Sequence, residues 1–279
     1  MSPPNDAPDR AAARLEPEAR LRDVVVAAID FETTGLAARG GDRVIEVAVV
    51  RGRLGETPES WHTLVQPERP VGATHIHGIT DAMLHGHPRF ADVVDQLLPR
   101  LEDAVIVAHN APFDRAFLEM ELERVGRPPP ASPWLDTLGL ARRVLALGDH
   151  RLATLCARLG IPRGQAHRAH DDARATWHLT DLLSHAADST GDLRLGHAQL
   201  LSRRRSPAEV EAVLARLEAA RRSGHTVVVD YLSGDAPDRP PTRRALTLTK
   251  VSRSRVVAWC HLRGAERTFR IDRMRIVED

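Results

Sequence analysis

Two acidic side chains, Asp30 and Glu32, stand at the end of an unbroken apolar run that begins at Val24. Such a run is typical of a buried β-strand, in which successive side chains point to opposite faces. Side chains two positions apart therefore emerge on the same face. Two carboxylates held together in this way repel each other unless a cation joins them. The pair predicts a cation site at the end of this strand.

Hydrolysis of a phosphodiester is one reaction that such a site can serve. The reaction needs the charge on the phosphate to be neutralised and a water to be deprotonated near neutral pH. Two Mg²⁺ or Mn²⁺ ions, roughly 4 Å apart, can do both when carboxylates from several elements hold them. Asp114 and Asp172 each begin a predicted helix and are the further candidates. We expect these four carboxylates to bind two divalent ions.

The elements that must position these acids follow from the apolar periodicity. Apolar and β-branched runs predict strands over residues 24–30, 44–50, 61–65 and 104–108. Helical spacing and end signals predict helices over residues 90–101, 112–125, 136–147, 152–159 and 171–187. The order β-β-β-α-β-α-α-α predicts an α/β domain over residues 23–188.

The flanking segments lack this pattern. Residues 1–22 are rich in Pro, Ala, Arg and Glu without a clear apolar face, which predicts a flexible leader. After the α/β domain the apolar periodicity lapses, until Pro207 begins a helix that ends near Gly224. Residues 189–223 are therefore expected to form a linker with one helix.

The C-terminal part differs in both pattern and charge. From residue 224 to residue 279 short β-branched runs alternate with polar residues, which predicts four or five strands in a small all-β barrel. Residues 1–191 carry 21 basic and 27 acidic side chains, whereas residues 192–279 carry 18 and 11. The net charges, near −6 and +7, suit cation binding in the first part and polyanion binding in the second.

Composition narrows the setting of the protein. No apolar run approaches the roughly 20 residues that span a bilayer, and the start lacks the layout of a secretion signal. Cys156 and Cys260 lie far apart without a companion thiol, which favours neither a disulfide framework nor a thiolate zinc site. We expect a cytoplasmic protein with no membrane partner.

Three motifs within residues 23–188 resemble those of the DEDDh exonucleases. This superfamily includes the proofreading epsilon subunit of bacterial replicative polymerase, oligoribonuclease and ribonuclease T. The motifs here read DFETTG from Asp30, HNAPFD from His109 and HRAHDDA from His167. An HGIT segment from His77 and a DT pair at Asp136 match as well. All of them occur in the family's order, which makes the resemblance specific.

The resemblance implies an RNase H-like α/β fold with a mixed central sheet. In such enzymes four carboxylates hold two metal ions and a histidine acts as general base. His167 takes that role because it lies five positions before Asp172, and an imidazole with a pKa of about 6.5 suits proton transfer near pH 7. His170 competes for the role but lacks the family spacing. The related subfamily with a catalytic tyrosine is excluded, because Arg168 occupies that position.

The same resemblance suggests which residues border the terminal nucleotide. These residues are Thr33, Thr34, Gly35, His77, Asn110 and Phe113. His77 and Phe113 could equally pack the fold. A zinc cluster of four histidines around His77 is the other interpretation of this region, but their spacing matches no common zinc pattern.

The C-terminal segment resembles a WYL domain, a small Sm- or SH3-like barrel found in bacterial regulators and nucleases. The resemblance rests on the runs WCHLR from Trp259 and RTFRIDR from Arg267. It implies nucleic-acid or ligand binding by Trp259, Arg263, Arg267, Arg270 and Arg273. Arginines that alternate on a strand would line one face, where they could contact phosphates. The competing interpretation is that they form structural ion pairs with Glu266 or Asp272.

The function expected from these features is a metal-dependent 3′→5′ exonuclease that trims 3′ ends of nucleic acid, with single-stranded DNA as substrate, in repair or turnover. Two alternatives stay open: a nucleic-acid-sensing regulator with a WYL-like ligand domain, and an RNA-directed exoribonuclease. Proofreading within a polymerase assembly would need a polymerase-binding tail, and the WYL-like segment occupies that place. DNA and RNA preference cannot be separated from these motifs, because the metal site contacts the phosphate.

Overall fold

The computed structural model describes residues 15–188, 190–202, 207–231 and 242–277, so most of the expected leader lies outside the described residues. Its strands are β1 (Val26–Thr33), β2 (Val44–Gly52), β3 (Glu59–Leu64), β4 (Val105–Ala108), β5 (Trp134–Asp136), β6 (Thr226–Tyr231), β7 (Thr242–Val251), β8 (Arg255–Cys260), β9 (Ala265–Arg270) and β10 (Met274–Ile276). Its α-helices are α1 (Thr74–His77), α2 (Asp81–Leu84), α3 (Phe90–Leu101), α4 (Ala111–Arg124), α5 (Thr137–Val144), α6 (Leu152–Leu159), α7 (Ala169–Ala187), α8 (Leu195–Ser202) and α9 (Pro207–Ser223), and the short 3-10 helices are η1 (Ala38–Gly40) and η2 (Ile271–Arg273). None of these helices is long and apolar enough to cross a membrane.

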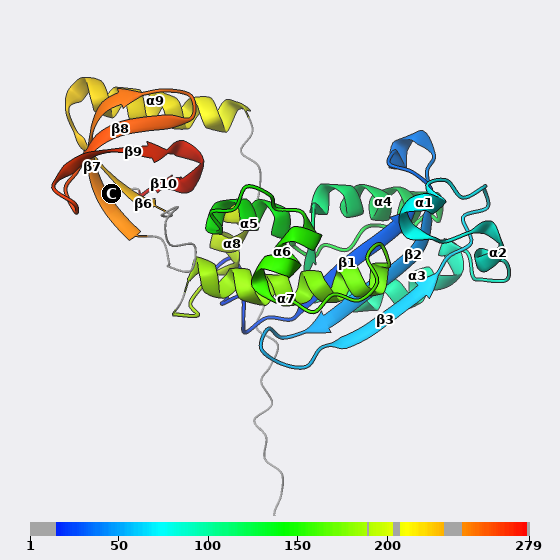
Figure 1. The fold of residues 1–279 in the computed structure, drawn as a ribbon. Coiled ribbons are helices and arrows are strands. Elements are labelled where there is room, and N and C mark those ends of the chain that lie inside the picture. The colour runs from blue at the N-terminus through cyan, green and yellow to red at the C-terminus, as the bar shows by residue number, and fades with distance from the viewer. Residues whose placement is uncertain (1–14, 189, 203–206, 232–241, 278–279) are drawn as a thin grey trace, which may run out of the picture.

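The first sheet has the strand order β3-β2-β1-β4-β5, and Figure 1 shows β3, β2 and β1 side by side. β1 pairs antiparallel with β2 and parallel with β4, so the sheet is mixed. β1, β2 and β4 are buried along most of their length, which explains their nearly continuous apolar sequence. The predicted α/β fold with a mixed central sheet is confirmed.

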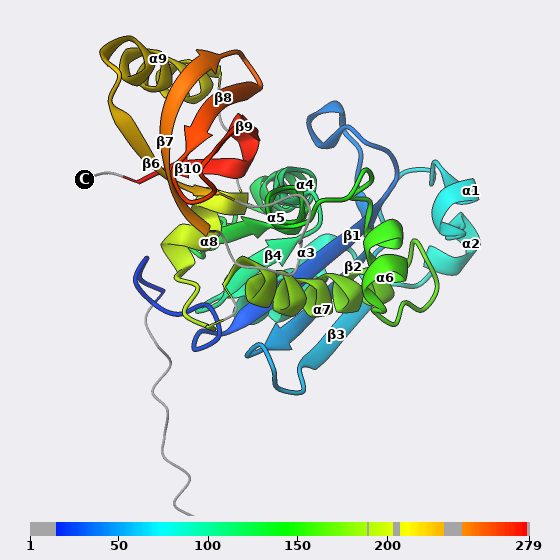
Figure 2. The ribbon, with the colours of Figure 1, turned by 60° about the vertical axis from the view of Figure 1, so that its left-hand side comes forward.

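Helices cover both faces of this sheet (Figure 2). α7 lies across one face, whereas α3 and α4 cover the other. Along β1, Val26 and Ala28 pack into the core under α7, and Ala27 and Ile29 pack into the opposite core. Because of this alternation, the even-numbered side chains at the end of β1 point to the α7 face. Asp30 and Glu32 therefore both lie on the α7 face of the sheet.

Four elements of this domain differ from the sequence-based expectation. α1, α2 and β5 are too short for periodicity to show, and α8 lies where the periodicity lapses. α8 packs against α5 through Leu195 and Ala198. A Cβ atom on Gly139 would lie 1.7 Å from the carbonyl oxygen of Ser202, so the close approach of the two helices requires glycine.

The second sheet is antiparallel throughout, with the order β10-β6-β7-β8-β9. Its core includes Val229, Leu246, Val256 and Phe269, and Leu217 of α9 packs into it. The number of predicted strands is confirmed, but the predicted barrel is wrong for the described residues. β9 and β10 lie at opposite edges of the sheet and do not pair with each other. A closed barrel requires the two edge strands to pair. The alternation of apolar and polar residues along a single strand does not determine whether they do.

Candidate active site

Three of the predicted carboxylates meet at the end of β1. Asp30 and Glu32 lie on the α7 face, and each keeps part of its surface open to solvent. Asp114 comes from the first turn of α4, is only 3% exposed, and accepts a hydrogen bond from the backbone N–H of Phe31 at 3.3 Å. Pro112 near the helix start suits this position, since a proline there sacrifices no helical hydrogen bond. Strand and helix thus hold their acids side by side.

The first turn of α7 and the segment before it complete the cluster. Asp172 is buried and accepts a hydrogen bond at 3.3 Å from the backbone N–H of His167. Glu32, His167 and Asp172 each offer one ligand atom, and these atoms lie within 4.8 Å of one another. His167 has a positive φ of 60°, which turns its exposed side chain to this group. The ring of His170 instead stacks on His62 at 4.8 Å between centroids, which favours His167 as the base.

The electrostatics of the cluster call for a cation. Burial raises the pKa of Asp30 well above its usual value, and the charges of Asp114, Asp172 and Glu32 raise it further. Burial and then Asp172 and Glu46 raise the pKa of Glu32 to about 8. Carboxylates crowded in this way are stabilised when a divalent ion lies among them. Oxygen ligands from carboxylates are those that Mg²⁺ and Mn²⁺ prefer, so the residues fit the implied metals.

Arg163 is a member of the site that the motifs do not reveal. Its Nε donates a hydrogen bond to Oδ1 of Asp172 at 2.8 Å, and its Nη2 forms an ion pair with the same oxygen at 2.7 Å. The ion pair is largely buried, and it neutralises part of the negative charge. Among the described residues, Asp172 is the one carboxylate of the four with a guanidinium ion pair. Nothing in the local sequence around Arg163 signals this contact.

Glu46 is a second missed residue, and it anchors the start of α7. It lies directly across from Glu32 in the β1–β2 register and is 1% exposed. Its carboxylate accepts two hydrogen bonds from Arg168, at 2.8 and 3.1 Å, and one from the backbone N–H of Ala169, at 3.1 Å. Arg168, which occupies the tyrosine position of the related subfamily, thus serves a structural ion pair. The pair fixes the helix that carries Asp172.

The DFETTG segment ends in a tight turn beside the acids. The hydroxyl of Thr33 donates to the Gly35 carbonyl, and that of Thr34 donates to Asp42 at 3.1 Å. A Cβ on Gly35 would lie 2.4 Å from the Asp42 carboxylate, so a larger residue would displace Asp42 from its hydrogen bonds with Thr34 and Ala37. The turn leaves Leu36 85% exposed next to the site. Thr33 and Thr34 therefore shape the turn, and Leu36 is the apolar group that it presents.

His77 and the HNAPFD segment support the site from two further sides. The Nδ1 atom of His77 accepts a hydrogen bond from the Ile79 N–H, so its Nε2 is the protonated nitrogen, and it donates to the Gly72 carbonyl. Burial lowers the pKa of His77, which agrees with this neutral form. On the other side Oδ1 of Asp136 accepts from the backbone N–H groups of Asn110, Ala111 and Leu138, at 3.0 to 3.2 Å. One carboxylate thus ties the starts of α4 and α5 together.

Comparison with known proteins agrees with this geometry. An exonuclease family model of the RNase T type matches residues 27–180, which is more than half of the chain. The DNA polymerase III subunit epsilon of Treponema pallidum is 36% identical over 195 residues, covering 68% of this chain and 90% of that protein. The chain belongs to the DEDDh exonuclease family. A second model, the WYL domain, matches residues 212–279 of this DEDDh exonuclease.

Other relatives show how far the likeness extends. A PolC-type DNA polymerase III from Thermotoga maritima is 37% identical over 164 residues, but the exonuclease spans only 12% of its length. The solved structure of exonuclease X with a 5′-overhanging duplex DNA is 26% identical, with a TM-score of 0.52 over 64% of this chain and 99% of that one. Exonuclease I of E. coli with a dT13 oligonucleotide, at 17% identity and a TM-score of 0.52, shares the fold.

The arginines predicted to bind ligand in the C-terminal segment lie in places that differ from the expectation. Arg267 and Arg270 are three positions apart on β9 and therefore point to opposite faces, so the prediction of a single arginine-lined face is wrong. Arg273 lies beyond the strand in η2, and Arg263 lies in the turn between β8 and β9. The alternative prediction of an ion pair with Asp272 concerns a side chain that lies outside the described residues.

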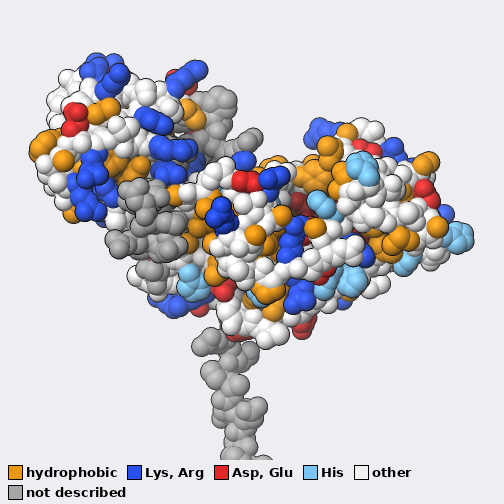
Figure 3. All heavy atoms as spheres, viewed as in Figure 1, with side chains coloured by type: hydrophobic (Ala, Val, Ile, Leu, Met, Phe, Trp, Pro, Cys, Tyr) orange, Lys and Arg blue, Asp and Glu red, His pale blue; other side chains and the backbone are white. Residues whose placement is uncertain are grey.

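A different pair of arginines meets on the outer face of this sheet. Arg255 of β8 is the direct cross-strand partner of Arg270 of β9, and both are exposed. Trp259, 45% exposed, lies on the same face of β8. Lys and Arg side chains gather over this part of the molecule (Figure 3). On the inner face Arg244 is buried, with its guanidinium 5.3 Å from the ring centroid of Tyr231. Sequence reasoning missed Arg244, since an arginine in a strand suggests an exposed position.

Proposed function

We propose that this DEDDh exonuclease removes nucleotides from the 3′ ends of nucleic acid, with single-stranded DNA as its substrate, in repair or turnover. The observation that carries the proposal is the convergence of Asp30, Glu32, Asp114 and Asp172 at the end of β1, with His167 beside Glu32 and Asp172. Crowded, half-buried carboxylates next to an exposed imidazole suit metal-assisted hydrolysis. The exonuclease family to which the chain belongs supports the reaction class.

Asp30, Glu32, Asp114 and Asp172 would hold two Mg²⁺ or Mn²⁺ ions. When bound, the ions supply positive charge to the phosphate and lower the pKa of an attacking water. His167 accepts a proton from that water, because its ring lies with Glu32 and Asp172 in one group of ligand atoms. Its exposure lets it pass the proton on to solvent. Arg163 keeps Oδ1 of Asp172 oriented through its hydrogen bond and ion pair.

The DFETTG turn and its neighbours bind the terminal nucleotide. Thr33, Thr34 and Gly35 hold the turn in shape, and Leu36 presents an exposed apolar surface on which a base can rest. Asn110 is exposed at the start of α4, and Phe113, half-buried, stacks on Phe117 at 4.8 Å. His77 supports the shape of this region, because both of its ring nitrogens already form hydrogen bonds with backbone groups.

The WYL domain holds a more distant part of the nucleic acid. Arg255 and Arg270 are direct partners on neighbouring strands, so two positive charges lie on one exposed face of the sheet. Trp259 on the same face offers a surface for base stacking. Arg263, Arg267 and Arg273 extend the positive charge around the edge of the sheet. We also propose that this sheet is related to Sm-like or SH3-like domains.

Single-stranded DNA is favoured over RNA by the relatives. The epsilon subunit is part of a DNA polymerase, and exonuclease I has been crystallised with a dT13 oligonucleotide. Degradation of matched 5′-labelled DNA and RNA strands in Mg²⁺ or Mn²⁺ tests the proposal. We expect a ladder of progressively shorter DNA and slower loss of RNA. Internal cleavage, shortening from the 5′ end, or no shortening in either metal would overturn it.

A further inference from the structure

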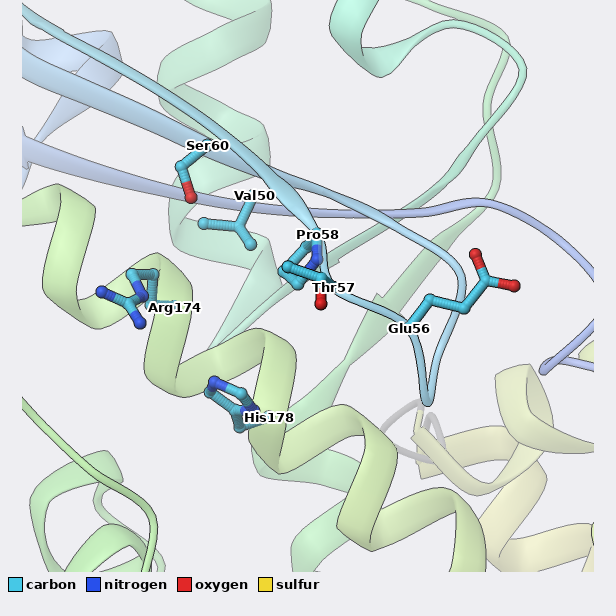
Figure 4. Close-up of a pocket in the computed structure, with 7 residues that line it drawn as sticks. All are labelled: Val50, Glu56, Thr57, Pro58, Ser60, Arg174 and His178. Atoms are coloured by element: carbon cyan, nitrogen blue, oxygen red, sulfur yellow. The ribbon is translucent and has the colours of Figure 1, made fainter.

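A groove away from the catalytic acids lies between α7 and the hairpin that joins β2 to β3. Its cavity has a volume of about 260 Å³. The residues that line it are Val50, Glu56, Thr57, Pro58, Ser60, Arg174 and His178. Figure 4 shows Arg174 and His178 projecting from successive turns of α7 towards the hairpin. We call this the α7–hairpin groove.

The chemistry of the α7–hairpin groove suits an anion. Arg174 is exposed and forms no ion pair with any residue that the structure describes. His178 lies one turn along the same helix face, and Ser60 and Thr57 offer hydroxyl groups opposite. Glu56 is the one acid in the lining, and it points away from the other side chains (Figure 4). The side chains that face the groove thus include an exposed guanidinium, an imidazole and two hydroxyl groups, although residues 1–191 carry a net charge near −6.

The groove and the catalytic acids lie on the same face of the first sheet. Asp30 pairs with Ala48 in the sheet, and Ala48 pairs with His62, so His62 lies two strands from Asp30 on the same face. His62 stacks on His170 at 4.8 Å. Arg174 lies one turn further along α7 than His170. His62, His170 and Arg174 therefore lie between the catalytic acids and the groove, with the Asp171 carboxylate 3.6 Å from the His170 ring.

We propose that the α7–hairpin groove binds the phosphodiester backbone of the strand that is being degraded, upstream of its 3′ end. Two strand spacings separate Asp30 from His62 by about 10 Å, and two further residues along β3 add roughly 7 Å. With one charge per 3.4 Å of strand, the groove receives phosphates about three to five nucleotides from the terminus. The inference rests on the proposed exonuclease function and assigns it a subsite.

The test compares substrates that reach the groove with one that does not. A p-nitrophenyl ester of thymidine 5′-monophosphate occupies only the terminal subsite, whereas a long single-stranded oligonucleotide also fills the groove. For Arg174→Ala we expect the KM of the oligonucleotide to rise by about five- to tenfold with kcat unchanged, and the ester to be cleaved as by the wild type. The salt dependence of log KM should lose about 0.7 in slope, which is one phosphate contact.

Two controls separate the possible outcomes. Arg127→Ala removes an arginine near the end of α4, on the opposite face of the sheet, and should change neither substrate. His178→Ala should give a smaller rise in the oligonucleotide KM than Arg174→Ala. An unchanged oligonucleotide KM for Arg174→Ala, or an equal loss on both substrates, would overturn the groove proposal. Failure of the wild-type chain on both substrates would instead overturn the exonuclease function itself.

Discussion

The end of β1 and the outer face of the C-terminal sheet concentrate charge in opposite ways. At β1 the charges are acidic and buried, and backbone N–H groups or guanidinium groups hold Asp114 and Asp172 in place. On the C-terminal sheet the charges are basic and exposed, with Arg255 directly opposite Arg270. Crowded buried charges with supporting contacts suit chemistry at a fixed position, whereas exposed arginines suit loose contact with a flexible polyanion.

The largest effect should come from neutralising one catalytic acid. Asp30→Asn keeps the shape of the side chain but removes a charge that the site needs for metal, so activity should fall by about a thousandfold or more. The same change relieves repulsion with Asp114 and Asp172, and the metal-free protein should melt at a higher temperature. Asp95→Asn on α3 is the control and should leave activity unchanged. Unimpaired degradation by Asp30→Asn would remove the acids from the mechanism.

A smaller loss is expected when the support of α7 is weakened. Glu46→Gln removes the charge that binds Arg168, so His167 and Asp172 are held less firmly, and activity should fall by about ten- to a hundredfold. A shifted pH profile or weaker Mn²⁺ binding would separate this effect from simple loss of folded protein.

The chain offers a matched control on the other side of the sheet. Glu121 is equally buried and accepts hydrogen bonds from the Arg43 guanidinium and the Val44 N–H, at 2.8 to 3.1 Å. Glu121→Gln should lower the melting temperature to a similar extent with little change in the activity of the folded protein. Equal losses of activity for Glu46→Gln and Glu121→Gln would show that Glu46 has no special positioning role.

Stability of the metal-free protein should fall as pH rises. Glu32 has a pKa of about 8 in the folded protein, above its ordinary value of 4.5, so the folded state retains a proton that the unfolded state has lost. The favourable contribution of Glu32 to the free energy of unfolding is present below pH 4.5 and is lost as pH rises through about 8. Thermal melts in a chelator, from pH 5 to pH 8.5, should show this decline, and Mn²⁺ should reverse it. Glu32→Gln should flatten the curve; an unchanged slope would contradict the assignment.

The smallest effect is expected when an exposed arginine of the C-terminal sheet is replaced. Arg255→Ala removes one phosphate contact, so binding of single-stranded DNA should weaken by about two- to fivefold, with a shallower salt dependence. Cleavage of a p-nitrophenyl nucleotide ester should stay at the wild-type level, because the ester does not reach this sheet. Fluorescence anisotropy at two salt concentrations measures the change, and unaltered binding would favour a purely structural role for the pair.

Sequence alone predicted the acids because each depends on a short local pattern. The period of two in β1 puts Asp30 and Glu32 on one face, and the motif order adds Asp114 and Asp172. Glu46 was missed although a signal existed: a single acid within an apolar strand must have a buried partner. That partner, Arg168, lies 122 positions away, beyond the reach of any local pattern.

The errors have the same physical origin. Arg267 and Arg270 were placed on one face because they recur in one segment, but a spacing of three changes face in a strand. Barrel closure and the packing of α8 depend on contacts between distant segments. Leu200 of α8 is exposed while Leu195 and Ala198 are buried, so the helix has no clean apolar periodicity to detect.

We propose that the converging acids bind the metal ions on which exonuclease activity depends. Shortening of a 5′-labelled single strand, followed while Mn²⁺ is titrated into chelator-treated protein, tests it most directly. We expect no shortening before metal is added, and then stepwise loss from the 3′ end that saturates with two ions bound per chain. Shortening at full rate in excess chelator, or by Asp30→Asn protein, would contradict it.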